Sequence, residues 1–362
     1  MLLGGGGFIG SNYYAGHGET YEQVTLVDRF DGPSHSSLSE HERLCSKLRH
    51  PDRIFTADAA EIGRWPELLA GSTDVFILNA DTGTGSSFAR PSFTVAENLS
   101  KLAAIVEAIR AHGAPERTRV IFTSSRAVYG EGRWHCPAHG TQPADRSREA
   151  LDAGRFAPMC PHCSVPLQLA GSVEHDAHRP LSVYGLTKSC GEDLLRLTLC
   201  AGGFDVRIAR FQNVYGIGQA IDNPYTGVLN WFSQALLEGS TVRVFERGLI
   251  VRDFIFVSDA VALLHALATT ERAPQDIGAP MIMNGGTGRA ARLIDVAHML
   301  RNRYGSSSEI IATNDFRTGD VLGAVADTSR AHTCLGLQPR VTLEEGIARY
   351  AAWFAERSKG AR

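Results

Sequence analysis

Hydrophobic residues in the first half of the chain form short continuous runs that alternate with longer amphipathic stretches. The runs Val24–Val27, Asp74–Leu78 and Arg119–Thr123 each end at a small or polar residue. Between the last two, Phe93–His112 carries apolar residues at helical spacing. Apolar strands separated by helices are typical of a parallel sheet covered on both faces. The pattern predicts an α/β fold built on a Rossmann-type doubly wound parallel sheet, because crossovers between parallel strands are right-handed.

The pattern changes twice further along the chain. Residues 130–180 are rich in Pro, Gly, His, Arg and Cys and show little periodicity, which indicates an insertion. Leu181–Cys200 returns to helical spacing, and Asp205–Ala209 to a strand-like run. Beyond residue 215 shorter strands and helices are mixed. We therefore expect a larger Rossmann domain over residues 1–215 and a smaller mixed α/β lobe over residues 216–362, interleaved with the first.

Composition and charge narrow the class of protein. Of the 362 residues, 43% are hydrophobic and 21% are charged, and the formal net charge is −3. A slightly acidic chain has no long-range field to attract nucleic acid or an anionic membrane. No apolar run approaches the ~18 residues of a membrane span, and no signal-peptide pattern is visible. The seven cysteines, an odd number, fit reduced thiols. We expect a cytoplasmic protein that binds neither nucleic acid nor membrane.

The opening MLLGGGGFIGS has the spacing of a dinucleotide-binding loop, Gly4-x-x-Gly7-x-x-Gly10, before a helix that begins at Phe8–Ile9. In such a loop the first glycine permits a tight turn, and the second lets the backbone approach a pyrophosphate. The third lets helix and strand pack closely. Asp28 closes the next strand and can accept hydrogen bonds from a ribose 2′-hydroxyl, which favours NAD over NADP.

Two details complicate the assignment of this loop. Arg29 directly follows Asp28 and could attract a 2′-phosphate. Only the segment Met1–Leu3 precedes the first glycine, which is shorter than the usual strand of ~5 residues. Either the first strand is short, or further residues precede this one.

Tyr184 and Lys188 are four residues apart on a helix predicted to begin near Ser182, so both side chains project from one face. A free phenol, with a pKa of ~10, is a poor base at neutral pH. A nearby ammonium and a nicotinamide cation would favour the phenolate, which could accept a proton from a sugar hydroxyl. The spacing occurs often by chance. Together with the glycine loop and a strand ending at Ser124–Ser125, it indicates a redox active site.

The chain resembles the extended short-chain dehydrogenases/reductases, and among them the NAD-dependent nucleotide-sugar epimerases and dehydratases. The segments that carry the resemblance are GGGGFIGS, SSRAVYG, SVYGLTK, RFQNVYG, RDFIFVSD and RTGD. The resemblance implies a catalytic trio of Ser125, Tyr184 and Lys188, in which the serine lies four residues before Tyr129. It implies that NAD is also contacted by the loop residues Gly4, Gly7, Phe8, Ile9 and Gly10, and by Asp28, Asp58, Ala80 and Asn98. It implies contacts to a nucleotide-diphosphate sugar by Ser125, Arg126, Asn213, Arg252 and Arg317.

Family members commonly pair through two helices from each subunit. In this chain those helices are Phe93–His112 and Leu181–Cys200, so the resemblance implies a homodimer.

The residues after the catalytic serine bear on the reaction. A 4,6-dehydratase of this family has an Asp-Glu pair there, whereas this chain has Arg126 and Ala127. Without these carboxylates, transient oxidation at carbon 4 leads to 4-epimerisation. A narrower resemblance, carried by SSRAVYGEG, FQNVYGIGQ, NPYTG and ADTGTGSS, is to bacterial dTDP-L-rhamnose 4-epimerases, although Asn79 and Asp81 depart from the usual pattern. A 4,6-dehydratase, a 4-ketoreductase and a non-catalytic NAD(P)-binding sensor remain the alternatives.

The insertion contains two short pairs of soft metal ligands, Cys136-x-x-His139 and Cys160-x-x-Cys163. Two such pairs about twenty residues apart are typical of a tetrahedral zinc site. Four protein ligands would make the zinc structural rather than catalytic. Unligated thiols or a Cys160–Cys163 redox pair are the alternatives. Two neighbouring histidines could replace a ligand, His135 and His162.

Overall fold

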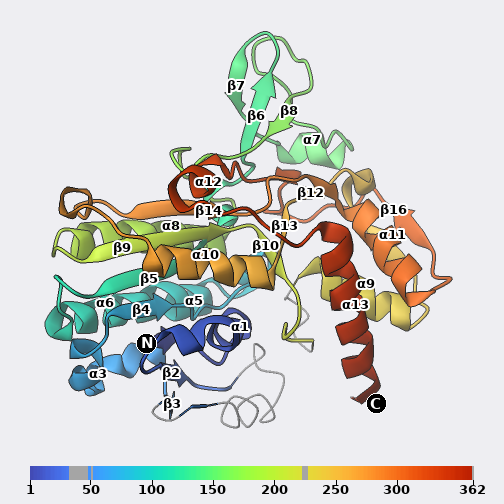
Figure 1. The fold of residues 1–362 in the computed structure, drawn as a ribbon. Helices are drawn as coiled ribbons and strands as arrows, with labels where there is room; N and C mark the ends of the chain where they lie inside the picture. Colours follow the sequence, from blue (N-terminus) through green and yellow to red (C-terminus); the bar gives the residue numbers. More distant parts are fainter. Residues whose placement is uncertain (32–47, 50–51, 222–226, 361–362) are drawn as a thin grey trace.

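A seven-stranded parallel sheet forms the centre of the molecule (Figure 1). The structure is a computed structural model that describes residues 1–31, 48–49, 52–221 and 227–360. The strand order is β14-β9-β5-β4-β1-β2-β3. The strands are β1 (Leu2–Leu3), β2 (Thr25–Asp28), β3 (Arg53–Thr56), β4 (Asp74–Ile77), β5 (Arg119–Ser125), β9 (Asp205–Phe211) and β14 (Met281–Gly285). The first strand is short but fully paired, because its two residues lie in register with both β2 and β4.

Helices cover both faces of the sheet, as the sequence predicts. Neighbouring strand residues such as Leu2 and Leu3, or Leu26 and Val27, belong to two different hydrophobic cores. One core packs under α1 (Phe8–His17) and α10 (Val257–Thr269), and the other under α3 (Pro66–Ala70) and α6 (Lys101–His112). The alternation follows from the period of two along a strand. The predicted doubly wound Rossmann-type fold is confirmed.

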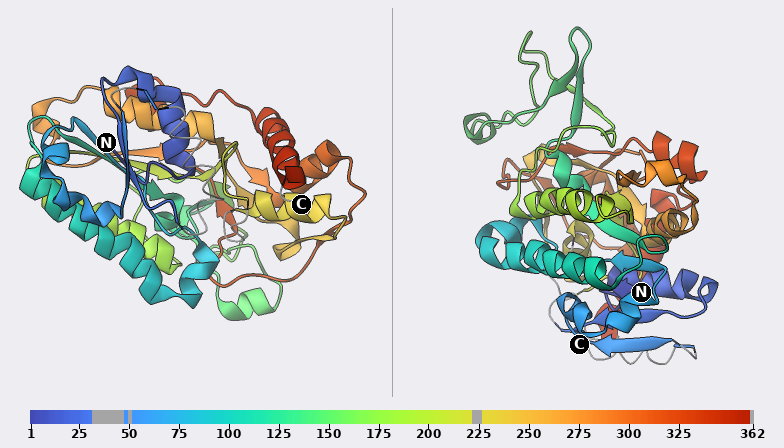
Figure 2. Two further views of the ribbon diagram at one scale, coloured as in Figure 1. Left: turned by 90° about the horizontal axis from the view of Figure 1, so that it is seen from below. Right: turned by 90° about the vertical axis from the view of Figure 1, so that its left-hand side faces the viewer.

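Two long helical segments lie side by side on one face (Figure 2). The first comprises α5 (Pro91–Val95), a π-helical turn at Ala96–Ser100 and α6. The second comprises α8 (Val183–Leu195) and a π-helical turn at Arg196–Cys200. The second begins at Val183 because the Ser182 side chain accepts a hydrogen bond from the Gly185 N–H and caps the helix.

The C-terminal part of the chain is mixed α/β, as predicted. Its helices are α9 (Val228–Leu237), α11 (Leu293–Tyr304), α12 (Ser329–Leu335) and α13 (Leu343–Gly360). Its short strands are β11 (Val242–Val244), β12 (Val251–Arg252), β13 (Phe254–Phe256), β15 (Ala291–Arg292), β16 (Ile310–Ala312) and β17 (Gly323–Ala324), and β13 pairs with β10 (Asn213–Tyr215) of the preceding part. They form the pairs β10–β13 and β11–β16 and the three-stranded set β15-β12-β17. Since β14 joins the central sheet, this part is interleaved with the first.

The insertion forms a small subdomain that projects from the body (Figures 1 and 2). It contains an antiparallel sheet in the order β7-β6-β8, made of β6 (Arg133–Cys136), β7 (Gly140–Pro143) and β8 (Gln168–Ala170), and one short helix, α7 (Arg148–Asp152). The short helix α4 (Thr84–Ala89), which precedes α5, belongs to the main body. Across the part of the chain that the structure describes, we find no helix with the length and apolarity needed to cross a bilayer.

Candidate active site

A cavity of about 490 Å³ lies at the carboxyl ends of the central strands. Its walls come from the loops after β1, β2 and β4, from the end of β5, and from the segment that follows β9. The chain reverses its direction of winding between β1 and β4, and ligands of doubly wound sheets bind at that point. The predicted residues that line the cavity are Gly4, Gly7, Phe8, Ile9, Gly10, Asp28, Asp58, Ala80, Ser125, Arg126, Tyr184, Lys188 and Asn213.

The glycine loop has the geometry that the motif requires. Gly4 adopts a positive φ of 82°, and a Cβ there would lie 2.6 Å from the Asn79 backbone nitrogen. At Gly10 a Cβ would lie 2.7 Å from the Gly4 carbonyl oxygen, so that glycine allows α1 to pack against the loop. Gly7 is the residue before α1 and faces the cavity, where a Cβ would meet only the Gly4 carbonyl oxygen, at 3.4 Å. The backbone and the start of α1 are therefore accessible to an anion.

Two carboxylates, those of Asp28 and Asp58, line the cavity beyond this loop. Asp28 is buried and accepts hydrogen bonds from the N–H groups of Gly6, at 2.9 Å, and Phe30, at 3.1 Å. Asp58 accepts the Ala60 N–H and forms an ion pair of 2.7 Å with Lys101. Burial alone would raise the pKa of Asp58, but these hydrogen bonds and the nearby cations outweigh it and lower that pKa.

The predicted catalytic trio comes together at one end of the cavity. Ser125 ends β5, while Tyr184 and Lys188 lie one turn apart on α8. The Lys188 Nζ donates a hydrogen bond of 2.8 Å to the Thr123 carbonyl and lies 4.7 Å from the centre of the Phe122 ring. Burial lowers the pKa of Lys188 to about 8, although the charge of Glu192 opposes the shift.

The groups that act on the Tyr184 phenol differ from the expected ones. Burial raises its pKa, while a side-chain hydrogen bond with Ser125 and the charge of Arg126 lower it, and Asp81 raises it further. The cation that favours the phenolate in the protein alone is thus Arg126, whereas Lys188 was expected. Lys188 instead occupies its own buried position against β5.

Arg126 belongs to a cluster of charges beside the phenol. Its Nε donates a hydrogen bond of 3.2 Å to the Asn213 side-chain oxygen. Burial lowers the pKa of Arg126 to about 9, and the charge of Arg252 adds to this effect, while Asp320 opposes it. The two carboxylates whose charges act on Arg126 are Asp320 and Glu131, and they already pair with Arg252 and Arg146. In the part of the chain that the structure describes, Arg126 itself forms no ion pair, so its guanidinium suits an anionic ligand.

Three of the predicted binding residues are not among the described residues that line the cavity. Asn98 holds the loop after β4 instead: its side chain bonds the Asp81 N–H and carbonyl and the Thr187 hydroxyl. Arg252 is buried against Asp320, with an ion pair of 2.5 Å. The third, Arg317, is exposed and lies over the Phe245 ring. The predicted motif NPYTG falls mostly within residues 222–226, outside the described residues.

Several polar residues that line the cavity are not among the predicted binding residues. Asp81 lines it and accepts a hydrogen bond from Thr94, and its charge reaches Tyr184. Two buried amide oxygens on the lining, those of Asn79 and Gln212, lack a hydrogen-bond partner among the described residues. Unsatisfied buried acceptors are costly, so they point to a ligand with hydroxyl or amide donors. The position of Asn79 and Asp81 directly after a predicted strand was the available signal.

The fold and this site define a class of protein. The profile of the NAD dependent epimerase/dehydratase family matches residues 1–279, and the chain belongs to that family. It is 31% identical over 360 residues to a dTDP-L-rhamnose 4-epimerase of Burkholderia thailandensis, with 98% of this chain and 94% of the relative covered.

Solved structures agree with this class. MoeE5, solved in complex with UDP-glucuronic acid and NAD, superposes with a TM-score of 0.74 at 26% identity, covering 99% of this chain and 98% of MoeE5. A UDP-glucuronic acid 4-epimerase from Bacillus cereus gives a TM-score of 0.79 at 22% identity, with 98% of both chains covered, and supports the fold.

Proposed function

We propose that the protein is an NAD-dependent nucleotide-sugar 4-epimerase. The observation that carries the proposal is the composition of the cavity: one continuous wall joins the glycine loop, Asp28, Ser125, Tyr184 and Lys188. A dinucleotide on the loop would extend along the carboxyl ends of the strands toward the trio.

The residues present fit NAD. The glycine loop offers backbone N–H groups to a pyrophosphate, Asp28 offers a carboxylate to ribose, and Asn79 offers an unsatisfied acceptor. When bound, NAD supplies reversible hydride transfer at carbon 4 of the sugar. Similarity to MoeE5, whose solved complex contains NAD, supports this assignment.

Residues of the chain would transfer the proton of the sugar 4-hydroxyl. Tyr184, as phenolate, takes the proton of the sugar 4-hydroxyl. The Ser125 hydroxyl, by hydrogen bonding, holds the Tyr184 oxygen and the sugar oxygen at carbon 4 in position. Lys188, one turn further along α8, lines the same cavity and is held against β5 by its hydrogen bond to the Thr123 carbonyl. After the resulting 4-keto sugar turns within the cavity, the same phenol returns the proton to the oxygen on the opposite face. No net oxidation results, as an isomerase requires.

The side chains beside the trio favour epimerisation over the alternatives. Elimination of water from carbons 5 and 6 requires an acid and a base there, whereas Arg126 and Ala127 occupy those positions. A ketoreductase would consume a reduced cofactor and release an alcohol. The complete catalytic trio argues against a non-catalytic sensor.

We further propose a dTDP-6-deoxy-L-hexose as substrate, interconverted as dTDP-L-rhamnose and dTDP-6-deoxy-L-talose. Similarity over almost the whole chain to the Burkholderia thailandensis enzyme supports this choice. The Arg126 guanidinium lines the cavity and forms no ion pair within the described residues, which supports an anionic diphosphate ligand. The test is incubation with dTDP-, UDP-, GDP- and CDP-sugars, with product identification by NMR. We expect a 4-epimer from a dTDP-6-deoxy-L-hexose without added cofactor, and a dehydrated or reduced product would contradict epimerisation.

The surroundings of Arg29 predict a preference for NAD over NADP. Its guanidinium already forms ion pairs with Asp31 at 3.0 Å, Asp58 at 3.4 Å and Glu97 at 3.3 Å. A 2′-phosphate would meet these carboxylates and Asp28, so we expect NADP to bind at least ~100-fold more weakly than NAD. Titration of cofactor-free protein measures the ratio. Equal affinities for NAD and NADP would contradict the preference for NAD. The variant Asp28→Asn is expected to reduce the ratio between the two affinities.

We propose a homodimer through the two adjacent helical segments. Several large apolar side chains on or beside them are exposed: Phe88, Phe93, Val95, Leu186 and Leu197. Such a group of side chains is typical of an interface. Light scattering is expected to give the mass of a dimer for the wild type. The control variant Leu249→Arg, which changes an exposed leucine outside these two segments, is expected to remain a dimer. The variant Leu186→Arg/Leu197→Arg is expected to be monomeric. A monomeric wild type would contradict the proposal.

A further inference from the structure

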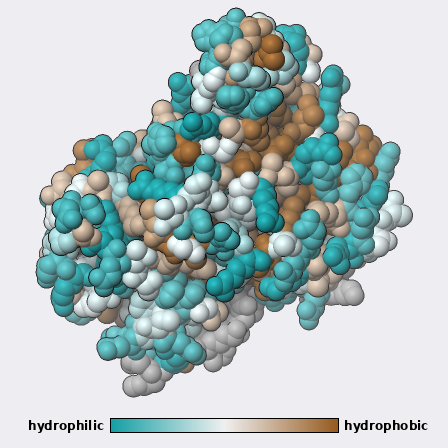
Figure 3. Space-filling view, turned by 45° about the horizontal axis from the view of Figure 1, so that its top comes forward, coloured by the Kyte–Doolittle hydropathy of each residue, from teal (hydrophilic) through white to brown (hydrophobic). Residues whose placement is uncertain are grey.

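The projecting subdomain has a very small hydrophobic core, which it shares with Leu322 from the C-terminal part of the chain. The buried residues that form it are Trp134, Cys136, Phe156, Cys160, Leu167 and Leu322. Figure 3 shows that the outward surface of this subdomain is largely hydrophilic. So few apolar side chains release too little free energy to order about fifty residues, and small folds of this kind usually contain disulfides or a metal.

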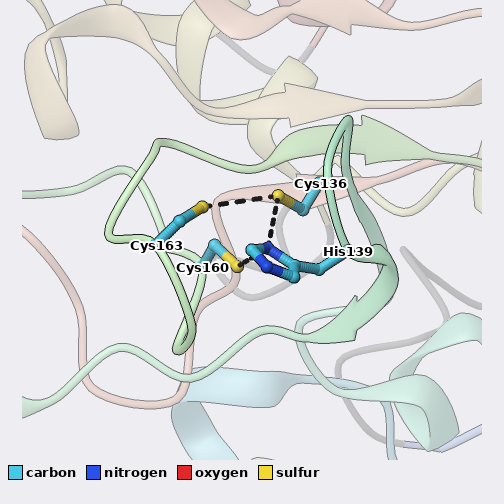
Figure 4. A group of neighbouring side chains, drawn as sticks. All are labelled: Cys136, His139, Cys160 and Cys163. Atoms are coloured by element: carbon cyan, nitrogen blue, oxygen red, sulfur yellow. Dashed lines mark hydrogen bonds between the residues drawn. The ribbon is translucent and has the colours of Figure 1, made fainter.

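Four side chains of the subdomain converge on one point (Figure 4). Cys136 and His139 come from the β6–β7 hairpin, and Cys160 and Cys163 from the loop before β8. Their ligand atoms all lie within 4.8 Å of one another. Cys136 Sγ is 3.5 Å from His139 Nδ1 and 3.7 Å from Cys163 Sγ, and Cys160 Sγ is 3.5 Å from His139 Nδ1.

Three of the six separations between the ligand atoms match the edges of a tetrahedron around a zinc ion, and none of the six exceeds 4.8 Å. Zinc–sulfur bonds of ~2.3 Å and a zinc–nitrogen bond of ~2.0–2.1 Å imply separations of about 3.8 Å between sulfurs and about 3.5 Å between sulfur and nitrogen. A disulfide would need a sulfur–sulfur distance of ~2.05 Å, far below the 3.7 Å between Cys136 and Cys163. Among the described residues six cysteines are free thiols, and the three cysteines of this group are among them.

We propose that Cys136, His139, Cys160 and Cys163 bind a structural zinc ion. Three thiolates and an imidazole select zinc over the oxygen-preferring divalent cations. All four positions are filled by the protein, so no place remains for a substrate or a catalytic water. Two ligands, Cys136 and Cys160, are each only 1% exposed and belong to the small core, so the ion joins the hairpin and the loop at the centre of the subdomain.

The metal would also stabilise a contact that connects the subdomain with the rest of the molecule. Arg146, which follows β7, is buried between the carboxylates of Glu131 and Glu246. It also donates a hydrogen bond of 2.8 Å to the carbonyl of Asp320, whose carboxylate holds Arg252. A loosened subdomain would therefore disturb the charged wall beside Tyr184, so metal loss is expected to lower kcat/KM.

Metal analysis of protein purified without chelators tests the proposal. We expect about one zinc ion per chain in the wild type and in Cys334→Ser, which removes an exposed thiol of α12. Cys163→Ser removes an exposed thiol of the cluster and is expected to lose most of the zinc. A strong chelator should lower the Tm of the wild type, and added zinc should restore it, because the ion binds only the folded site.

A spectroscopic measurement keeps the proposal testable if the cysteine variant does not fold. Wild-type protein reconstituted with Co²⁺ is expected to show the visible and thiolate charge-transfer bands of a tetrahedral sulfur site. Wild-type protein that contains no zinc after incubation with it would overturn the proposal. So would a native thiol count lower by two than that of the reduced protein, because it would indicate a disulfide. Both outcomes are independent of the epimerase activity.

Discussion

Tyr184→Phe is expected to lower kcat about 10²–10⁴-fold while leaving NAD affinity nearly unchanged. The substitution removes only the hydroxyl that accepts the sugar proton, and the ring still fills its place beside Ser125 and Arg126. The glycine loop and Asp28, which would hold the dinucleotide, lie in other parts of the cavity. Steady-state kinetics and cofactor titration measure the two effects separately.

Tyr304→Phe provides the matched control for this substitution. The Tyr304 hydroxyl donates a hydrogen bond of 2.9 Å to Ser233, on α9 of the C-terminal part. The substitution removes a partly buried tyrosine hydroxyl that does not line the cavity, so turnover should be unchanged. If Tyr184→Phe retained wild-type turnover, the phenol would not be the proton acceptor.

Arg210→Met is expected to lower the free energy of unfolding by about 3–5 kcal/mol. Arg210 is 2% exposed, and its guanidinium forms an ion pair of 2.7 Å with Glu192 and bonds the Tyr129 hydroxyl at 2.9 Å. Without it, the Glu192 carboxylate stays buried, and the partners that remain to it among the described residues are the Ser124 hydroxyl at 2.5 Å and the His178 ring at 3.7 Å. Denaturant titration of the cofactor-free protein measures the loss.

A surface ion pair near the same helix gives the control. Arg196 pairs with Asp193 at 3.1 Å, and both side chains are exposed, so Arg196→Met should change stability by less than ~1 kcal/mol. The double variant Arg210→Met/Glu192→Gln is expected to recover part of the loss, since it leaves no unpaired buried charge. Equal stabilities of Arg210→Met and Arg196→Met would show that the buried pair contributes little.

Local patterns predicted the fold and the glycine loop well. The strands of the central sheet are apolar on both faces, and Gly4 and Gly10 are required by backbone approaches of 2.6 Å and 2.7 Å that no side chain tolerates. The spacing of Tyr184 and Lys188 on one helix placed both in one cavity. These features depend on residues close in sequence, which is why the sequence reveals them.

Partners distant in sequence were harder to predict. Whether an arginine faces a cavity depends on which carboxylate reaches it, and Arg252 is held by Asp320, which is far away along the chain. Asn98 likewise bonds the backbone of Asp81 and stabilises the cavity wall from behind. The cation that acts on Tyr184 is Arg126, because the packing of β5 against α8 brings the two together. The spacing of residues along the sequence does not predict that contact.

Retention of a deuterium label at carbon 4 tests the central claim most directly. In the proposed reaction the hydrogen at carbon 4 would leave as hydride to tightly held NAD and return to the same carbon from the other face. A dTDP-6-deoxy-L-hexose labelled with deuterium at carbon 4 is converted in ordinary water, and the epimer is analysed by NMR. We predict that the product keeps the deuterium at carbon 4, and its replacement by hydrogen from the solvent would contradict the account.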